Sequence, residues 1–234
     1  MSALALARTV LRLDVVGSSA GGRGRQVHLD RALEAVLDRA IDAVRDPRYP
    51  IAGSFRRADG DSATLVVEAG VAKAWVVADF VLREVLIAVG EENRVANPEH
   101  RLRLRVAIDH GEIVVEGQHV GGDPVVATAR LVDAPRLRES LADAPDQDLG
   151  LIVSDRFHGE VVRRGERGLD QVAFQPVDVP VSGSRLMGWL WVPPGGTRIP
   201  RARRDRSAAK SADGVRIMRA GSPDVLLDLV GPDD

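Results

Sequence analysis

Apolar residues recur along this sequence with two periods, and the order in which the periods alternate constrains the fold more than any other feature. A period of two residues predicts a strand, and a period between three and four predicts a helix. Expected strands cover residues 10–16, 51–55, 63–67, 102–108, 113–115, 149–153, 172–179 and 186–192, and expected helices cover 29–44, 74–89, 124–141 and 155–162. The resulting order, β-α-β-β-α-β-β-α-β-α-β-β, mixes hairpins with crossover helices and predicts an α+β domain around a mixed sheet.

Glycine, proline and aspartate mark the expected turns and helix ends. The segment Asp59–Ser62 reads Asp-Gly-Asp-Ser between two apolar runs, which is typical of a tight hairpin turn. Gly111 is expected to turn the half-exposed strand before it into the strand that follows. Asp123 is expected to cap the third long helix, with Pro124 at its first position and Pro135 as a kink or break.

Composition limits the classes of partner. The chain has 234 residues, 44% of them hydrophobic, a net charge of −2 and no cysteine. Disulfides and thiolate metal sites are therefore excluded, and no global field attracts nucleic acid or an anionic membrane. Charged residues interrupt the apolar start, and no stretch of 18 apolar residues occurs, so we expect a cytoplasmic protein without a signal peptide or membrane span.

The chain is expected to contain one domain and an appendage. Residues 1–194 are predicted to form the domain, and residues 195–234 an Arg-rich linker with a flexible C-terminal tail. The apolar residues within 215–230 are either a docking segment for a protein partner or the domain, or a frayed tail.

Two carboxylates stand where predicted strands end. Asp14 ends the first strand, and Asp61 lies in the hairpin turn. If those strands are neighbours, both side chains meet at one edge of the sheet, where carboxylates and phosphate oxygens together suit Mg²⁺ or Mn²⁺. The loop backbone at Gly17, Ser18 and Ser19 offers N–H groups to phosphates. Each residue alone is also explained as an ordinary turn residue.

Three segments carry a resemblance to a known family. They read VLRLDVVGSS (10–19), RRADGDSATLVV (56–67) and LRLRVAIDHGEIVVEGQHVGGDPVVATARLVDA (102–134). In this order and spacing the chain resembles class III adenylate/guanylate cyclase homology domains over roughly residues 8–193. It is similar to a divergent branch common in high-GC bacteria. The resemblance implies a ferredoxin-like nucleotidyl cyclase fold, a mixed sheet with helices on one face.

The resemblance also implies a site and a reaction. Asp14 and Asp61 would hold two Mg²⁺ or Mn²⁺ ions, and Arg130 matches the arginine that stabilises the transition state. A nucleoside triphosphate would become a 3′,5′-cyclic monophosphate and pyrophosphate. Because the family's sites form between two protomers, a homodimer is implied. The implied nucleotide-binding positions are Val15, Gly17, Ser18, Ser19, Arg57, His119 and Val126.

The sequence departs from the family at the nucleotide pocket. Val126 replaces the ribose-orienting Asn and cannot donate a hydrogen bond. Arg57 replaces the base-reading Lys, and His119 replaces Asp or Thr. Asp109 stands where the family usually has His. The chain is therefore either a cyclase with an unusual base preference, such as a pyrimidine, or a catalytically degenerate dimer that binds a nucleotide or a partner.

One alternative rests on Gly121-Gly122-Asp123, which resembles the signature of diguanylate cyclases. That signature lies in a hairpin, whereas Pro124 here is expected to begin a helix. The five histidines show no metal-ligand spacing, and no Gly-x-Ser-x-Gly nucleophile elbow occurs.

Overall fold

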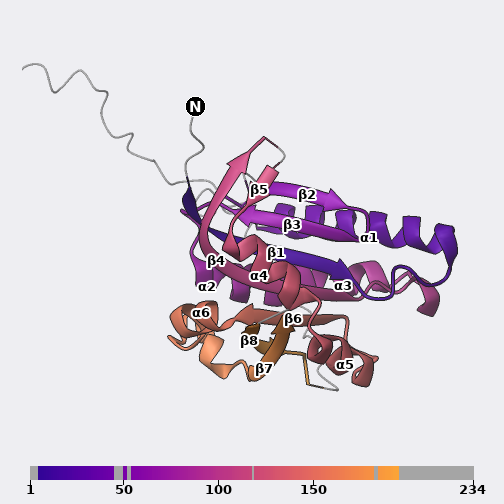
Figure 1. Cartoon of the computed structure of the whole chain (residues 1–234). Helices are drawn as coiled ribbons and strands as arrows, with labels where there is room; N and C mark the ends of the chain where they lie inside the picture. Colours follow the sequence, from indigo (N-terminus) through magenta and orange to yellow (C-terminus); the bar gives the residue numbers. More distant parts are fainter. Residues whose placement is uncertain (1–4, 45–49, 52–53, 118, 182–183, 195–234) are drawn as a thin grey trace, which may run out of the picture. The chain divides into compact units, whose positions relative to one another are not determined.

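The computed structural model describes residues 5–44, 50–51, 54–117, 119–181 and 184–194. Their strands are β1 (Leu6–Val15), β2 (Phe55–Asp59), β3 (Ser62–Val67), β4 (Leu104–Glu116), β5 (His119–Gly121), β6 (Leu149–Ser154), β7 (Gln175–Val181) and β8 (Ser184–Trp191). They form one sheet with the order β2-β3-β1-β4-β6-β8-β7, and β5 pairs with β4 (Figure 1). β4 and β6 are parallel and the other neighbouring pairs antiparallel, which confirms the predicted mixed sheet and α+β class.

The helices are α1 (Gly22–Ala43), α2 (Lys73–Trp75), α3 (Leu86–Asn93), α4 (Asp123–Val132), α5 (Pro135–Asp143) and α6 (Asp155–Phe157). A π-helical segment, Val76–Val85, joins α2 to α3, and another, His158–Val162, extends α6; short 3₁₀ turns lie at Pro98–His100 and Glu166–Gln171. The run from α2 to α3 is therefore continuous, as its apolar period predicts. The break between α4 and α5 falls at the proline that predicts it.

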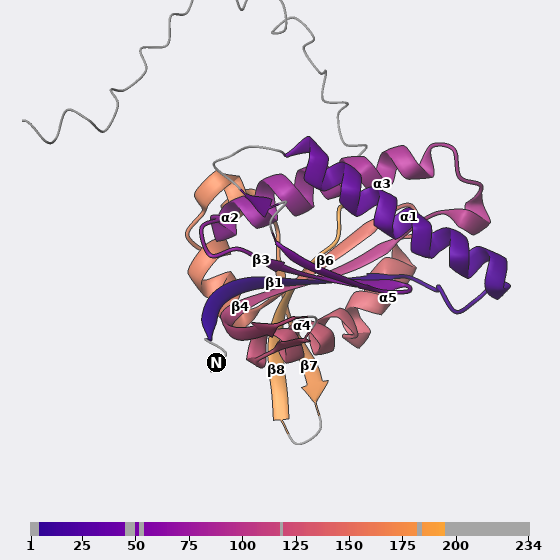
Figure 2. The same ribbon diagram turned by 90° about the horizontal axis from the view of Figure 1, so that it is seen from above.

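Helices cover both faces of the sheet (Figure 2). α1 and the helical run from α2 to α3 pack on one face, over a core that includes Leu11 and Val106. α4 and α5 pack on the other face, against Ala107 and Ile152. The expectation of helices on one face is corrected by this arrangement. Every residue of β6 is buried, and a strand buried on both sides needs cover on both.

The residues of β1 alternate between the two faces of the sheet. Leu11 and Leu13 belong to the core under α1. Arg12 and Asp14 point to the opposite face, on which α4 packs. β1 therefore delivers polar side chains to the α4 side of the sheet while its other side builds the core.

The expected hairpin is present but its first strand is displaced. β2 covers residues 55–59 rather than 51–55, and Asp59 pairs with Ser62 around a two-residue turn. Gly60, at the tip, has φ of 61°, which glycine adopts without steric cost. The turn lies where the Asp-Gly signal predicts.

The turn expected at Gly111 is wrong, because β4 continues through this residue to Glu116. A Cβ at Gly111 would lie 3.0 Å from Cγ of Pro124 and 3.2 Å from the Arg156 guanidinium. The glycine thus permits the close approach of α4 and α6 to the strand. The strand is also not half exposed, since residues 106–110 are all buried between the helical layers.

Helix ends agree with the sequence to within a few residues, with one exception. α4 begins at Asp123, and Gly122 takes the cap position expected for Asp123. Ser154 caps α6 as predicted, its Oγ accepting a hydrogen bond from the Phe157 amide at 3.1 Å. The exception is α1, which begins seven residues earlier than its apolar pattern, at Gly22.

The predicted linker and tail over 195–234, and the candidate docking segment over 215–230, lie outside the described residues. Their assignment and the domain end at residue 194 stay predictions. Within the described part of the chain, no helix combines the length and apolar character required to cross a bilayer.

Candidate active site

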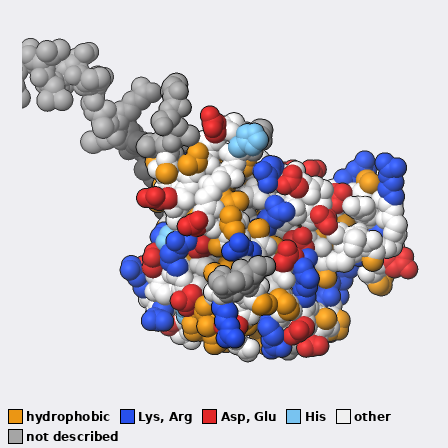
Figure 3. All heavy atoms as spheres, viewed as in Figure 1, with side chains coloured by type: hydrophobic (Ala, Val, Ile, Leu, Met, Phe, Trp, Pro, Cys, Tyr) orange, Lys and Arg blue, Asp and Glu red, His pale blue; other side chains and the backbone are white. Residues whose placement is uncertain are grey.

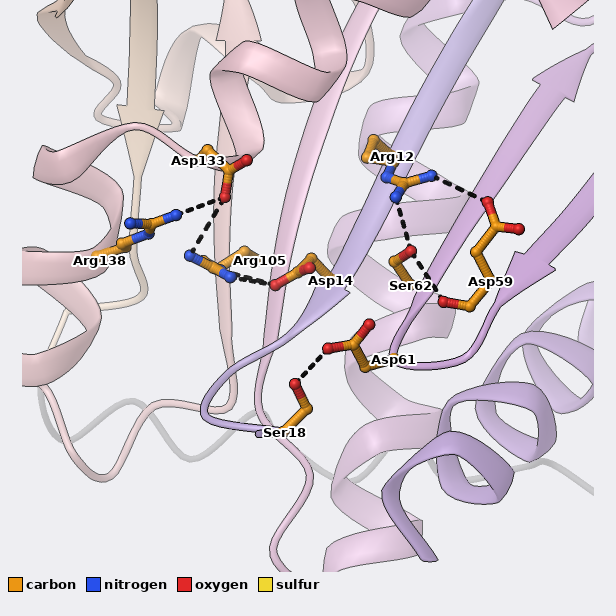
Figure 4. A network of polar contacts seen from close by, with 9 residues as sticks. All are labelled: Arg12, Asp14, Ser18, Asp59, Asp61, Ser62, Arg105, Asp133 and Arg138. Atoms are coloured by element: carbon orange, nitrogen blue, oxygen red, sulfur yellow. Dashed lines mark hydrogen bonds and ion pairs between the residues drawn. The ribbon is translucent and has the colours of Figure 1, made fainter. Parts of the chain in front are cut away.

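Asp14 and Asp61 lie at the same end of the neighbouring strands β1 and β3, with the Asp14 carboxylate turned to Arg105 and the Asp61 carboxylate to Ser18 (Figure 4). In the antiparallel pair of β1 and β3, Asp14 lies opposite Ser62. The next residue, Val15, donates its amide to the Asp61 carbonyl oxygen at 2.9 Å. The first strand and the hairpin turn therefore meet at the place that the sequence predicts.

The Asp14 carboxylate is bound by a guanidinium. Arg105 lies opposite Asp14 on β4, and its Nε donates to Asp14 Oδ2 at 3.0 Å while its Nη2 donates to the same oxygen. Burial raises the pKa of Asp14; Arg105 opposes that shift, whereas the charges of Asp61 and Asp133 add to it. The ionised form of Asp14 is therefore disfavoured here, and a further cation beside it would favour that form.

Asp61 is held by the loop after β1 and faces a third acid. Ser18 Oγ donates to Asp61 Oδ2, which fastens the loop to the hairpin turn. Burial, and then the charges of Asp61 and Glu34, raise the pKa of Asp30 on α1. Oδ1 of Asp30 is buried without a hydrogen-bond partner among the described residues. Sequence analysis missed Asp30, whose only signal was a carboxylate beside the apolar stripe of the first helix.

An arginine of α1 fixes the loop at residues 17–21. Arg25 Nη1 donates to the carbonyl oxygens of Gly17 and Ala20 at 2.6 and 2.9 Å, and Nε donates to that of Glu99 at 2.7 Å. Among the hydrogen bonds of the described residues, none has a backbone amide of residues 17–19 as donor. The carbonyl oxygens of Gly17 and Ala20 are therefore turned toward Arg25.

The donor set fits a divalent cation that also takes oxygen ligands from a bound molecule. Asp14 and Asp61 supply two carboxylates, the ligand type that Mg²⁺ prefers. The described residues contain no group of three or more acidic or histidine side chains arranged to hold a metal ion. Arg105 also already forms an ion pair with the Asp14 carboxylate. A cation here needs further oxygen ligands beyond these two carboxylates.

The remaining predicted residues lie on other elements than the two acids. Arg57 is on β2, where its Nε donates to Asp59 at 3.0 Å, and His119 opens β5 with its side chain exposed. Val126 and Arg130 lie on the exposed side of α4. No hydrogen bond or ion pair within the described ranges joins these four residues to Asp14 or Asp61.

The side chain of Val15 points into the core and not toward the two acids. It is 1% exposed and packs in the core under α1. Its amide is used by the Asp61 carbonyl. A nucleotide contact at this position would have to be made by the backbone.

Asp109, at the position of the family's His, is buried and makes contacts that support the fold. It is 2% exposed, and it accepts hydrogen bonds from Ser154 Oγ at 2.5 Å and Arg156 Nη2 at 2.8 Å. These contacts fasten β4 to the end of β6 and to α6. The departure from the family is therefore accommodated by a paired, buried carboxylate.

The most informative residues that sequence analysis missed are Arg105, Asp133 and Arg138. Arg105 lies between Asp14 and Asp133, and Arg138 binds Asp133 from α5 (Figure 4). The alternation of Arg with apolar residues indicated only a half-exposed strand. Its partner depends on the register of β1 against β4, which composition does not reveal.

The fold is similar to that of solved cyclase domains. An adenylate/guanylate cyclase/hydrolase from Silicibacter pomeroyi is 21% identical with a TM-score of 0.54, over 82% of this chain and 100% of that chain. A monomeric guanylyl cyclase domain of the RhoGC fusion protein from the aquatic fungus Blastocladiella emersonii is 13% identical with a TM-score of 0.52, over 82% and 99%. The catalytic core of a rhodopsin-guanylyl cyclase with converted specificity, solved with ATPαS, is 17% identical with a TM-score of 0.50, over 80% and 94%.

No protein-family model matches the sequence, and no curated protein matches it. The structural similarity nevertheless covers 82% of this chain and 99–100% of two of the cyclase domains. The chain has the fold of a class III nucleotidyl cyclase domain.

Proposed function

We propose that this chain is a metal-dependent nucleotidyl cyclase that converts a nucleoside triphosphate to a 3′,5′-cyclic monophosphate and pyrophosphate. The observation that carries the proposal is the meeting of Asp14 and Asp61 beside the loop at residues 17–21, in a cyclase fold. Burial, and also the charge of Asp61, raise the pKa of Asp14; an acid in such a place is costly for stability when ionised, and a cation site is a reason to keep it.

In the proposed reaction the ribose 3′-oxygen attacks the α-phosphorus. The bond from that phosphorus to the bridging oxygen breaks, pyrophosphate leaves with the bond's electron pair, and the hydroxyl proton passes to solvent. Mg²⁺ or Mn²⁺, two in the family pattern, would neutralise phosphate charge and acidify the hydroxyl. Asp14 and Asp61 would hold the cation, and the amides of residues 17–19 would donate to the phosphates.

The rest of the site is proposed to come from a second copy of the chain. Arg130 would stabilise the charge that develops on the phosphate oxygens. Arg57 and His119 would contact the base, and Val126 would lie next to the ribose. A homodimer is supported by the resemblance to the family, and within the described part of one chain no hydrogen bond or ion pair joins these four residues to the two acids. The proposed location is the cytoplasm, where nucleoside triphosphates are available.

A second candidate function is a nucleotide-binding or partner-binding module without turnover. Its specific support is that Arg105 already binds Asp14, and that Val126 is 47% exposed and carries no hydrogen-bonding group. In this reading the fold and the acids remain, but the ribose is not oriented for attack.

The test is a screen of ATP, GTP, CTP and UTP with purified full-length protein and Mn²⁺, with cyclic products identified by mass spectrometry. The proposal expects at least one cyclic product, and its loss in Asp14→Asn and Asp61→Asn. Asp178→Asn is the matched control, because this exposed acid lies on β7 outside the site. Absence of all four products, with nucleotide binding retained in calorimetry, would establish the second function instead.

The dimer is tested by mixing two impaired variants. Asp14→Asn and Arg130→Ala alter opposite halves of a shared site, so a mixed dimer contains one intact site. An equal mixture is expected to recover about a quarter of the wild-type rate, as random exchange between two-fold dimers dictates. Recovery no greater than the sum of the two variants alone would place Arg130 in the same half as Asp14.

A further inference from the structure

Two histidines hold the short helical segment that α6 and the π-helical turn after it form, residues 155–162. His158 begins the π-helical turn and stacks on Trp189 of β8, with ring centroids 3.7 Å apart and ring planes 3° apart. His110 of β4 pairs with Glu160 in the middle of the turn, with 2.8 Å between Nε2 and Oε2. The segment is thereby fastened to two strands of the sheet, β4 and β8.

Each of these histidines has one buried ring nitrogen without a hydrogen-bond partner. Neither His110 Nδ1 nor His158 Nδ1 has a partner among the described residues, and the two residues are only 7% and 9% exposed. A carboxylate only accepts hydrogen bonds, so the Nε2–H of His110 points to Glu160 and Nδ1 of the neutral ring carries a lone pair. A proton added to either ring leaves an N–H at a buried Nδ1 that no acceptor receives.

Charged groups from three elements face His110. They are Lys73 on α2, Arg156 on α6 and Glu160 on the π-helical turn, and the residue opposite on β1 is the uncharged Thr9. Burial, and then the charge of Lys73, lower the pKa of His110; Glu160 acts the other way, and Arg156 lowers it further. Since Glu160 also lies 3.3 Å from Lys73 Nζ, part of its charge is already compensated. A proton on His110 is therefore disfavoured while the segment stays in place.

His158 has mostly aromatic surroundings. Its ring packs on Trp189 and, edge to face, on Phe174 with centroids 6.0 Å apart. Burial, and then the charge of Arg163, lower the pKa of His158, and Asp155 opposes them. A charged ring would gain from the face of Trp189, but that gain is smaller than the cost of a buried N–H without an acceptor. His158 therefore holds the segment as a neutral ring.

The surface does not impose a field of one sign on these rings. Acidic and basic side chains are interspersed over the face seen in Figure 3. Charges beyond about 10 Å are also largely screened at ordinary salt concentrations. Local contacts therefore decide where the two histidines bind protons.

We infer that residues 155–162 form a proton-sensitive latch, which stays on β4 and β8 while His110 and His158 are neutral and is released when either ring is protonated. A released ring gives both of its N–H groups to water, so the penalty at Nδ1 disappears. The latch differs from a general loss of stability in acid, because only this segment opens. It does not depend on which reaction the chain catalyses.

The latch lies next to α4. A Cβ at Gly111 would lie 3.0 Å from Cγ of Pro124 and 3.2 Å from the guanidinium of Arg156. Arg156 belongs to the segment, and Pro124 is the second residue of α4. Release of the segment therefore removes a neighbour of the helix that carries Arg130, and its consequence for turnover rests on the proposed function.

The experiment measures amide hydrogen exchange of the nucleotide-free, full-length protein at pH 7.5 and 5.5, corrected for the intrinsic pH dependence of exchange. A released histidine titrates near 6.5, so at pH 5.5 its charged form exceeds its neutral form about tenfold. Each ring that stays neutral in the closed segment therefore raises the opening constant by up to about tenfold. Acidification is expected to lower the protection of residues 158–163 about ten- to a hundredfold, with β6 more protected throughout.

Two variants remove the titration and keep the contacts. His110→Gln retains an amide donor for Glu160, and His158→Phe retains a flat ring on Trp189. Each is expected to reduce the acid-dependent loss of protection about tenfold. His119→Gln, at an exposed position of β5, is the matched control and is expected to follow wild type. Thermal melts at pH 7.5 confirm that each variant is folded.

Two results would overturn the latch. One is the same acid-dependent loss in wild type and all three variants. The other is equal protection of the segment and β6 at both pH values, because the segment would then open only when the whole fold unfolds. If the expected pattern holds but no nucleotide is cyclised, the latch stands and the proposed function fails. If a cyclic product forms and the protection of the segment does not change with pH, the proposed function stands and the latch fails.

Discussion

Arg105 and Asp14 face each other across β4 and β1, and Arg105 also lines a small cavity together with Arg138 and Leu141 of α5. Their side chains are only 12% and 18% exposed. A pair so little exposed is costly to break one partner at a time, because the remaining charge is left without compensation. Arg105 therefore compensates the negative charge of Asp14.

The first prediction concerns the guanidinium that pairs with Asp14. Arg105→Gln is expected to lower the free energy of unfolding by about 2 kcal/mol at pH 7.5, since Asp14 is left ionised and partly buried. Without the guanidinium the pKa of Asp14 rises further, so the folded state binds a proton more readily than the unfolded state. The loss should therefore shrink as pH falls through the raised pKa. Urea titrations at several pH values measure this.

The same variant reports on metal binding. Mn²⁺ is expected to raise the melting temperature of Arg105→Gln more than that of wild type, because the ion no longer competes with a guanidinium. Arg101→Gln, which removes a comparable pair with Asp148 away from the site, is the control. An equal response of the two variants to Mn²⁺ would argue against a cation at Asp14.

The second prediction concerns the buried carboxylate at the family's His position. Asp109→Ala is expected to cost about 3 kcal/mol, because the Ser154 hydroxyl and the Arg156 guanidinium both lose their acceptor. Asp178→Ala, at an exposed ion pair, should lower the free energy of unfolding by no more than about 0.5 kcal/mol. Chemical denaturation compares the two. Similar losses would mean that Asp109 does not fasten β4 to α6.

Local sequence patterns predicted the parts of the site that depend on neighbouring residues. Asp14 was found because a strand ends there, and Asp61 because Asp-Gly marks a hairpin tip. Their meeting followed from topology alone, since a first strand beside a hairpin brings both to one edge. The mixed sheet and the order of its helices followed in the same way.

The parts that depend on register and tertiary packing were not predictable. Arg105 meets Asp14 only because β4 pairs with β1 in one particular register, and a shift by one residue would turn it to the other face. Gly111 reads as a turn, yet it lies inside a strand, where its missing side chain leaves room for Pro124. The apolar period likewise gave the wrong start for α1, whose first turns are mostly polar and whose buried residues begin at Leu29.

The third prediction is a pH dependence of stability. Burial, and then the charge of Lys73, lower the pKa of His110; burial, and then the charge of Arg163, lower that of His158. The unfolded chain titrates near 6.5 and binds more protons than the folded chain between that value and the lowered ones. The free energy of unfolding should therefore fall as pH falls from 7.5 to 5.5.

Two variants isolate the histidine contribution. His110→Gln and His158→Gln are each expected to lose less stability over that pH range than wild type. His119→Gln, at an exposed position of β5, is the control and should follow wild type. Parallel curves for all four proteins would assign the pH dependence to other groups.

The fourth prediction tests the arginine that holds the loop. Arg25→Ala frees the carbonyls of Gly17 and Ala20, so the loop amides are no longer presented in one arrangement. Nucleotide affinity is expected to fall about tenfold, the order of one lost positioning contact in a binding site. Arg23→Ala, at an exposed position of the same helix, should bind as wild type does. Unchanged affinity in both variants would exclude a role of the loop in binding.

The fifth prediction separates the two candidate functions. Val126 is 47% exposed near the start of α4, so Val126→Asn is expected to alter the free energy of unfolding by no more than about 0.5 kcal/mol. Asn can donate a hydrogen bond to the ribose, which holds the 3′-oxygen for attack. If the chain is a cyclase, kcat should rise about tenfold or more with KM nearly constant, because orientation acts in the transition state.

Val125→Asn, which alters the adjacent and less exposed residue, should bring no such gain. An inactive Val126→Asn variant that still binds nucleotide would show that the missing ribose contact is not what prevents turnover, and the binding module would then be the better account.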